Sequence, residues 1–257
     1  MGFPHFPDKN KYPGVLKPEE MLSFRGKDVK DLLGGASSAI LCFQSSAFRH
    51  LSDQFRGRKI DGFMGKVAAL KKNGHKIAAV QPFGFGGPAA AVALEELAAS
   101  GVNRCVAIGI CGFLQPTIGP GDIIVPTEAI RDEGTSYHYL PPEKTALPSD
   151  KLQQRFMSVL TRRDFEYISG QVWTTDAPYR ETGEEVSLYQ DNGILGVDME
   201  TSAFFCVSSA LKMEAACGLV AADSLVDGTW RPCHDHRKVN AAIRQLADSA
   251  VEALLEG

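Results

Sequence analysis

The stretch QPFGFGGPAAAVALEELAASGVNRCVAIGICG, residues 81–112, decides the fold that we expect for this chain. It predicts a strand, a glycine-rich turn, an alanine-rich helix, a second strand and a second glycine turn. Pro88 suits the first turn of the helix, and Gly101 suits its C-terminal end. In a parallel sheet both turns lie at the carboxyl edge, where α/β proteins bind small ligands. The glycines of residues 84–87 would let such a ligand approach the backbone closely.

Strands and helices alternate along the rest of the chain. This alternation predicts a single α/β domain over residues 1–257, with a mainly parallel sheet covered on both faces. Residues 1–35 form an irregular lead-in with a short helix near 18–33. The expected strands are 39–43, 76–82, 104–110, 122–131, 167–174 and 215–221, and the expected helices are 46–55, 88–100, 150–163, 201–211 and 238–255.

The composition of the 257 residues, 44% hydrophobic and 23% charged, is that of a globular protein. A net charge of −4 offers no broad attraction to nucleic acid or to anionic membranes. No apolar run approaches the roughly 20 residues that cross a bilayer. The N-terminal sequence MGFPHFPDKNKYPG lacks the apolar core of a signal peptide. We therefore expect a cytoplasmic protein without nucleic-acid or membrane partners.

The six cysteines form no CxxC pair. Four of them lie in apolar segments, which indicates buried free thiols and a reducing compartment rather than a disulfide framework. These four are Cys42, Cys105, Cys111 and Cys206. The sequence CHDH, Cys233 to His236, has the residue types of a metal site but no second Cys or His pair nearby, so we expect a polar loop and no metal.

Polar side chains gather in two loops that follow expected strands. The first, RDEGTSYHY at residues 131–139, is either a display of functional groups or a solvated turn in which Arg131 pairs with Asp132. The second is TTDAPYRET at residues 174–182. In it Tyr179 can stack on a planar ring, and Arg180 or Glu181 can hydrogen-bond the edge of that ring. An exposed loop with a stacked Arg–Tyr pair is the alternative.

Carboxylates follow two further segments. In GVDMET, residues 196–201, Asp198 and Glu200 alternate, so only one of them needs to face a pocket. Glu200 can accept hydrogen bonds from two neighbouring sugar hydroxyls, although acids at a helix N-terminus have a simpler electrostatic reason. Asp223 follows an apolar strand in VAADS. It can protonate a leaving group if burial raises its pKa, or it can cap the next turn.

Taken together, these segments resemble the nucleoside phosphorylase and nucleosidase superfamily, most closely its uridine phosphorylase branch. The resemblance runs from about Ala36 to the C-terminal helix. FGFGGPAAAVALEEL is similar to the glycine turn and helix of that branch, and IGICGFLQPTIGPGDIIVPTEAIRDEGTSYHY to its next strand-turn-strand unit. GVDMETSAFF and VAADS resemble its ribose-binding and acid segments.

The resemblance implies a three-layer αβα sandwich that assembles as a homodimer or as a hexamer of three dimers and acts in nucleoside salvage. It also implies roles for residues at matching positions. Met199, Glu200 and His5 would hold the ribose, Asp223 would protonate the leaving base, and Gly86, Thr175, Tyr179 and Arg180 would line the base pocket.

The chain departs from this family where phosphate binds. The family's first phosphate loop is a Gly-Asp-Pro turn followed by Arg, but here it reads CFQSSAFRHL, with Ala47 at the arginine. Ala107 and Ile110 replace the arginine and the hydroxyl residue of the next phosphate loop. The Gln and Arg that read a pyrimidine are also missing, apart from Arg180. The side chains and backbone left to hold phosphate are Gln44, Ser45, Arg49 and Gly84.

We therefore rank three functions. The first is phosphorolysis of a nucleoside to free base and (deoxy)ribose 1-phosphate, with phosphate as co-substrate and no cofactor. The second is hydrolysis by water, and the third is a catalytically inactive nucleoside-binding homologue. Phosphate dependence separates the first two functions, and turnover separates both from the third.

Overall fold

The computed structural model describes residues 4, 6, 8–26 and 32–256. Its strands form one mixed sheet in the order β2-β3-β4-β1-β5-β8-β7-β6-β9. The strands are β1 Ser38–Cys42, β2 Arg58–Ile60, β3 Gly65–Lys72, β4 His75–Pro82, β5 Arg104–Phe113, β6 Ile123–Asp132, β7 Ile168–Thr175, β8 Gly196–Asp198 and β9 Glu214–Ser224. Parallel pairing joins β4, β1, β5 and β9, whereas β2, β3 and β4 pair in antiparallel fashion.

The sheet closes on itself at one end. The long strand β5 pairs with β9 in parallel along most of its length and with β8 in antiparallel fashion at its C-terminal end. From β8 the ladder continues through β7 and β6 and returns to β9. Five strands therefore enclose a barrel-like region, while β1 to β4 extend from it as an open sheet. The loops that the sequence marks as functional follow the carboxyl ends of β4 in the open sheet and of β6 and β7 in the barrel-like region.

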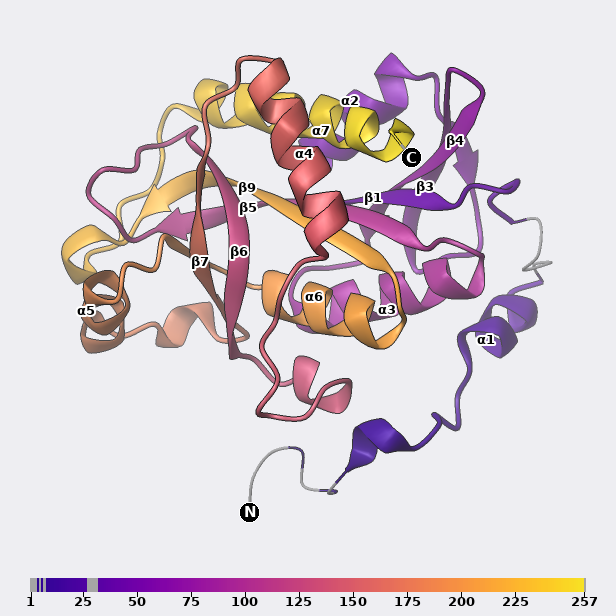
Figure 1. Cartoon of the computed structure of the whole chain (residues 1–257), viewed down its shortest axis with the longest axis horizontal. Helices are drawn as coiled ribbons and strands as arrows, with labels where there is room; N and C mark the ends of the chain where they lie inside the picture. The colour runs from indigo at the N-terminus through magenta and orange to yellow at the C-terminus, as the bar shows by residue number, and fades with distance from the viewer. Residues whose placement is uncertain (1–3, 5, 7, 27–31, 257) are drawn as a thin grey trace.

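Helices cover both faces of the sheet, as Figure 1 shows. They are α1 Pro18–Phe24, α2 Ser45–Gln54, α3 Gly87–Ala99, α4 Asp150–Arg162, α5 Gly183–Asp191, α6 Thr201–Ala210 and α7 His236–Leu255. One layer contains α2, α4 and α7, in which α7 contacts both of the others, and the other layer contains α3 and α6. Each layer buries its own apolar cluster against the sheet, so the predicted three-layer αβα fold is confirmed. Among the described residues no helix is both long and apolar enough to span a bilayer.

Most of the elements that were not predicted from the sequence are short or polar. The hairpin β2–β3 begins with the exposed Arg58 and Lys59, and β8 has only three residues. Helix α5 has a capping box in which Thr182 and Glu185 bond each other's backbone, but it buries only Val186. The helix expected near 18–33 ends at Phe24. Periodicity did not reveal β2, β8 and α5 because these elements are short or bury too few apolar residues to give a repeating pattern.

The cysteine prediction is confirmed. Cys42, Cys105, Cys111 and Cys206 are all buried, and each is a free thiol. Burial raises the pKa of Cys105 to about 12 and that of Cys206 to about 11, so these thiols stay protonated and unreactive at neutral pH.

Candidate active site

The glycine turn after β4 and the segment after β8 meet at a hydrogen bond. Glu200, which is 8% exposed, accepts the backbone N–H of Gly86 at Oε1 over 2.6 Å. Gly86 has a φ of 84°, a left-handed conformation that favours glycine. A Cβ on Gly86 would face the carbonyl and the methyl group of Met199 at 3.8 and 3.9 Å. Thus Gly86 and the neighbouring pair Met199 and Glu200, more than 110 residues further along the chain, form one small site at the start of α3.

Asp198 fixes the backbone from which Glu200 projects. Its carboxylate is buried and accepts the Thr174 hydroxyl over 2.7 Å, the Thr201 N–H over 2.9 Å and the Thr201 hydroxyl. These bonds tie the end of β7 to the first turn of α6. Of the two alternating acids, Asp198 therefore accepts hydrogen bonds that hold the fold together, and Glu200 is the one that faces the glycine turn.

The two carboxylates also interact electrostatically. Burial raises the pKa of Asp198 above its ordinary value, although hydrogen bonds from Thr201, Thr174 and the backbone of Glu200 oppose this shift. Burial is also the main cause that raises the pKa of Glu200, and the negative charge of Asp198 raises it further. Glu200 is consequently a carboxylate whose charge is easily lost when the pH falls.

A buried polar network extends this arrangement to the loop after β6. Ser202 donates its N–H to Thr174 Oγ1 and its hydroxyl to Glu133 Oε1, each over 3.0 Å. The other oxygen of Glu133 accepts the N–H of Ser136 over 2.9 Å. These residues were not predicted from the sequence. The signal for them was the presence of polar side chains directly after apolar strands.

Arg131 holds its own loop together and does not pair with Asp132, so the alternative of a solvated turn with that ion pair is not what the structure has. Its guanidinium stacks on Tyr137, with 4.2 Å to the ring centroid. Asp132 instead accepts the indole N–H of Trp173 over 3.0 Å. The donors of Arg131 are directed to the Ser136 hydroxyl and to the carbonyls of Leu140, Pro141 and Lys144. The loop is therefore a braced scaffold that packs on α6.

The residues expected to bind a base are divided between two places. Thr175 and Arg180 line a pocket of about 630 Å³ at the ends of β6 and β7, together with Asp176, whose carboxylate accepts the N–H of Gly134. Gly86 does not line this pocket and lies instead beside Glu200. Glu133 links the two places, because it lines the pocket and bonds to α6. Tyr179 is fully exposed and stacks on no ring among the described residues.

The residues expected to bind phosphate lie around the start of α2 and the glycine turn. Gln44 is the N-cap of α2, Ser45 is its first residue, and a Cβ on Gly84 would meet open space. Arg49 does not take the place of the missing arginine. Ala47 at that position is completely buried, and residues two apart project about 200° apart around a helix, which leaves Arg49 on the exposed side.

The two other positions at which the chain departs from the family's phosphate site, Ala107 and Ile110, lie in apolar surroundings. Ala107 is buried in the cluster beneath α3 and α6, and Ile110 packs against the cluster on the opposite face. Neither side chain supplies a hydrogen-bond donor, so β5 contributes no side-chain anion contact here.

Asp223 lies half-buried at the end of β9, where its Oδ1 accepts the N–H of Cys233 over 3.0 Å. The thiol of Cys233 donates to the carbonyl of Asp235, and the Asp235 side chain caps α7. The CHDH segment is thus an ordered entry to α7. Within the described residues no three His, Cys, Asp or Glu side chains gather as a metal site would require. His5, expected to reach the ribose, lies outside the described residues.

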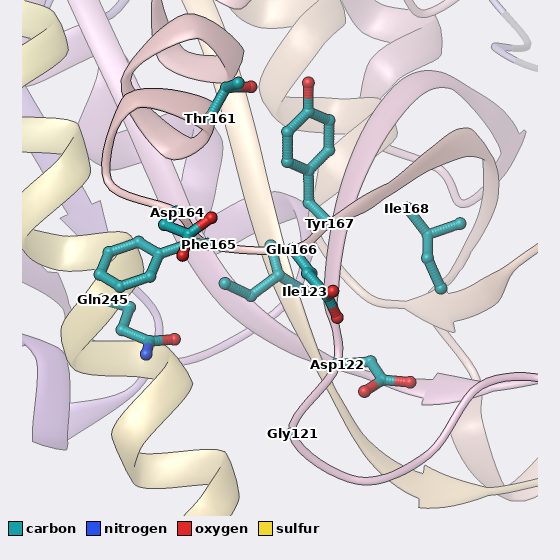
Figure 2. A pocket seen from close by; sticks show the side chains of 10 residues that line it. All are labelled: Gly121, Asp122, Ile123, Thr161, Asp164, Phe165, Glu166, Tyr167, Ile168 and Gln245. Carbon is teal, nitrogen blue, oxygen red and sulfur yellow. The ribbon is translucent and has the colours of Figure 1, made fainter.

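A larger pocket, of about 880 Å³, lies away from all of these residues (Figure 2). It is formed by the end of α4, the middle of α7 and the beginnings of β6 and β7. Its polar lining includes the exposed Asp164 and Glu166. None of the predicted site residues lines this pocket, so its size alone does not make it the active site.

The fold and this geometry agree with the comparisons to known proteins. The family model described as "Phosphorylase superfamily" matches residues 40–256. A guanosine phosphorylase from Halorubrum lacusprofundi is 32% identical over 172 residues, which cover 67% of this chain and 71% of the relative. A uridine phosphorylase from Haemophilus influenzae is 28% identical over 186 residues, with the same two coverages.

Solved structures give the same result. A uridine phosphorylase from Vibrio fischeri, in complex with 6-hydroxy-1-naphthoic acid, superimposes with a TM-score of 0.75 at 26% identity and covers 86% of this chain and 92% of its own. The resemblance expected from the sequence motifs is therefore confirmed. The match over residues 40–256 means that the chain belongs to the phosphorylase superfamily and is an enzyme of the pentosyltransferase type.

Proposed function

We propose that this enzyme cleaves the N-glycosidic bond of a nucleoside by phosphorolysis, giving a free base and (deoxy)ribose 1-phosphate. The observation that carries this proposal is the buried Glu200 carboxylate, held 2.6 Å from the Gly86 N–H at the glycine turn. A carboxylate has several lone pairs, so one bond to the backbone leaves acceptors for the 2′- and 3′-hydroxyls of a sugar. The names of the relatives, guanosine and uridine phosphorylase, support a nucleoside substrate.

In this mechanism Glu200 and Met199 fix the sugar while the bond from C1′ to the base nitrogen stretches. Positive charge develops on the sugar, and an anionic Glu200 stabilises it more in the transition state than in the ground state. Asp223 would protonate the departing base, and its Oδ2 is the oxygen not engaged by Cys233. Phosphate then attacks C1′ and forms the new C–O bond as the C–N bond breaks.

The base and phosphate positions complete the proposal. Thr175 and Arg180 would contact the base edge, and Tyr179 would stack on the base. Phosphate, as co-substrate without any cofactor, would be held by Gln44, Ser45 and the backbone at Gly84, where a Cβ would meet open space. Arg49 would join them only if its side chain crossed from the exposed face of α2.

A second function is favoured by Ala107 and Ile110. An apolar lining at the anion position costs desolvation and returns no hydrogen bond to phosphate. Each missing bidentate Arg–phosphate contact is worth about 1.5–3 kcal/mol. Hydrolysis by water, or nucleoside binding without turnover, therefore remains the alternative to phosphorolysis.

A product assay separates these functions. The purified protein is incubated with guanosine, uridine and their 2′-deoxy forms, with and without phosphate. We expect free base together with (deoxy)ribose 1-phosphate, formed only in the presence of phosphate. Free ribose without phosphate would identify a hydrolase. Release of neither product, while nucleosides still raise the melting temperature, would identify a binding protein.

The role of Glu200 is tested by Glu200→Gln, which keeps the shape of the side chain and an acceptor for Gly86. The variant loses a charge-assisted hydrogen bond to the sugar, so we expect nucleoside affinity to fall by more than about 1 kcal/mol, roughly fivefold in Kd. Calorimetric titration measures this change. Glu184→Gln, an exposed acid on α5, is the matched control and should bind like the wild type. Unchanged affinity in Glu200→Gln would remove that residue from the site.

The pH dependence of binding follows from the raised pKa of Glu200. The charged form binds the sugar, so affinity is full above the raised pKa and is lost as the pH falls through it. This loss should begin at higher pH than an ordinary glutamate, with a pKa near 4.3, would allow. In Asp198→Asn the neighbouring charge is gone, and the midpoint of the loss should move to lower pH. A purely structural role for Asp198 would lower affinity without moving this midpoint.

We include in this proposal a homo-oligomer, a dimer or a hexamer, and a cytoplasmic location. The oligomer is supported by apolar side chains that are 40–88% exposed around the glycine turn and the end of α1: Phe24, Met64, Phe83 and Phe85. Pairing of Gly65 with Pro82 brings Met64 close to Phe83, and Arg25 bonds to the carbonyl of Gly62. Such a gathering of apolar surface is typical of subunit interfaces.

Sedimentation velocity tests the assembly directly. We expect the wild type to sediment as a dimer or hexamer, and Phe85→Asp to shift it toward the monomer because a charge would be buried in the interface. Lys17→Ala, an exposed control on the same lead-in, should leave the distribution unchanged. A wild type that sediments as a monomer would contradict the oligomer.

A further inference from the structure

A basic groove lies at the edge of the sheet opposite to the candidate active site. Two pockets, of about 350 and 260 Å³, share Ser37 and Arg104 at the amino ends of β1 and β5. Because β1, β4 and β5 run in parallel, these amino ends lie away from Gly86, which follows the carboxyl end of β4. The basic side chains that line the two pockets, here called the basic groove, are His75, Lys76, Arg104, Lys151, Arg155 and Lys212.

The walls of the groove are fixed by backbone hydrogen bonds. The N–H groups of Asn103 and Arg104 both donate to the carbonyl of Ser37, and the N–H of Glu214 donates to the carbonyl of Asn103 over 2.8 Å. The start of α4 is joined to β9 through Ser149, whose hydroxyl accepts the N–H of Ala215 over 2.8 Å. The groove is therefore formed before any ligand arrives, and binding would not have to order its walls.

Three cations of the groove, Lys151, Arg155 and Lys212, differ from other basic residues of this protein that pair with carboxylates. Arg162 and Arg163, at the far end of α4, bind Glu252 and neighbouring acids. At the near end, Lys151, Arg155 and Lys212 make no ion pair and no side-chain hydrogen bond within the described part of the chain. In a chain with a net charge of −4, three neighbouring unpaired cations are a local excess.

This excess is unfavourable in the free protein. Lys151 and Arg155 lie four residues apart on α4, where like charges face each other and repel. The amino end of the 13-residue helix α4 adds a partial positive charge at the same place. Glu214 is the one carboxylate among the described residues that line these two pockets. An anion in the groove would relieve the repulsion.

We propose that the basic groove binds a small anion with two or more linked phosphate groups, such as a nucleoside triphosphate. Arg155 presents a guanidinium group that matches two phosphate oxygens, and Lys151 and Lys212 add two ammonium groups beside it. The cations follow one another through both pockets, which fits a chain of phosphates better than a single ion. Lys76 is held at one end by its bond to the carbonyl of Gly34. This site is independent of the nucleoside site and of the reaction proposed for it.

Calorimetric titration at one fixed ionic strength of about 0.15 M tests the proposal, because screening is then equal for every ligand. The probes are inorganic tripolyphosphate, ATP and inorganic phosphate. We expect tripolyphosphate and ATP to bind more tightly than phosphate. Tighter binding of ATP than of tripolyphosphate would show that the groove also reads the nucleoside, and equal binding would assign the affinity to the phosphate chain alone.

A pair of matched variants locates the binding. Lys151→Ala/Arg155→Ala should weaken tripolyphosphate binding at least tenfold. Lys17→Ala/Arg244→Ala removes the same charge from exposed positions outside the groove and should stay within twofold of the wild type. Both changes are at the protein surface, and circular dichroism checks that the fold is retained.

Four outcomes would overturn the proposal. The first is the absence of any heat with tripolyphosphate or ATP at millimolar concentrations, and the second is an equal loss in both double variants. The third is competition by a saturating nucleoside, which would place the anion at the candidate active site. The last is tighter binding of a short oligonucleotide than of either small anion, which would assign the groove to nucleic acid.

Discussion

The carboxylate of Asp198 is the constraint on which the site depends. A buried charge is tolerated only when donors surround it, and here Thr174 and Thr201 supply them from β7 and α6. These bonds fix the short strand β8 against the start of α6. The side chain of Glu200 then points toward Gly86 and accepts its N–H. Two acids separated by a single residue thus have different tasks: Asp198 bonds inside the fold, and Glu200 faces the glycine turn where we propose that the sugar binds.

The two halves of the site have unequal chemistry. The side around Glu200, where we propose that the sugar binds, is polar, and the network through Ser202 and Glu133 connects it to the loop that Arg131 holds together. The anion side has apolar residues at Ala107 and Ile110 and only neutral polar groups at the start of α2. A family member with this division needs either a new phosphate cradle or a different nucleophile. Three cations that make no ion pair within the described part of the chain, Lys151, Arg155 and Lys212, lie instead at the opposite edge of the sheet, in the basic groove.

Much of the fold could be predicted from the sequence, because the elements that determine it have strong local signals. The strand β4, the glycine turn, the alanine-rich helix α3 and the strand β5 follow from residues 76–112. The hairpin β2–β3 and the strand β8 could not be predicted, since pairing with neighbours places them. Within the site, the role of Asp198 depends on the distant donor Thr174, and the contacts of Arg131 depend on how its own loop folds back on it. Arg49 has the charge that a phosphate-binding residue needs, but its position on α2 places its side chain on the exposed face of the helix.

The central claim is that Glu200 recognises the hydroxyls of a ribose. The most direct measurement compares the affinity of the wild-type protein for guanosine and for 2′,3′-dideoxyguanosine by calorimetric titration. Both ligands carry the same base, so the difference reports only the hydroxyl contacts. The account predicts that the dideoxy compound binds at least about tenfold more weakly, as expected for the loss of a hydrogen bond to a charged acceptor. Equal affinities would contradict the account and place the sugar elsewhere.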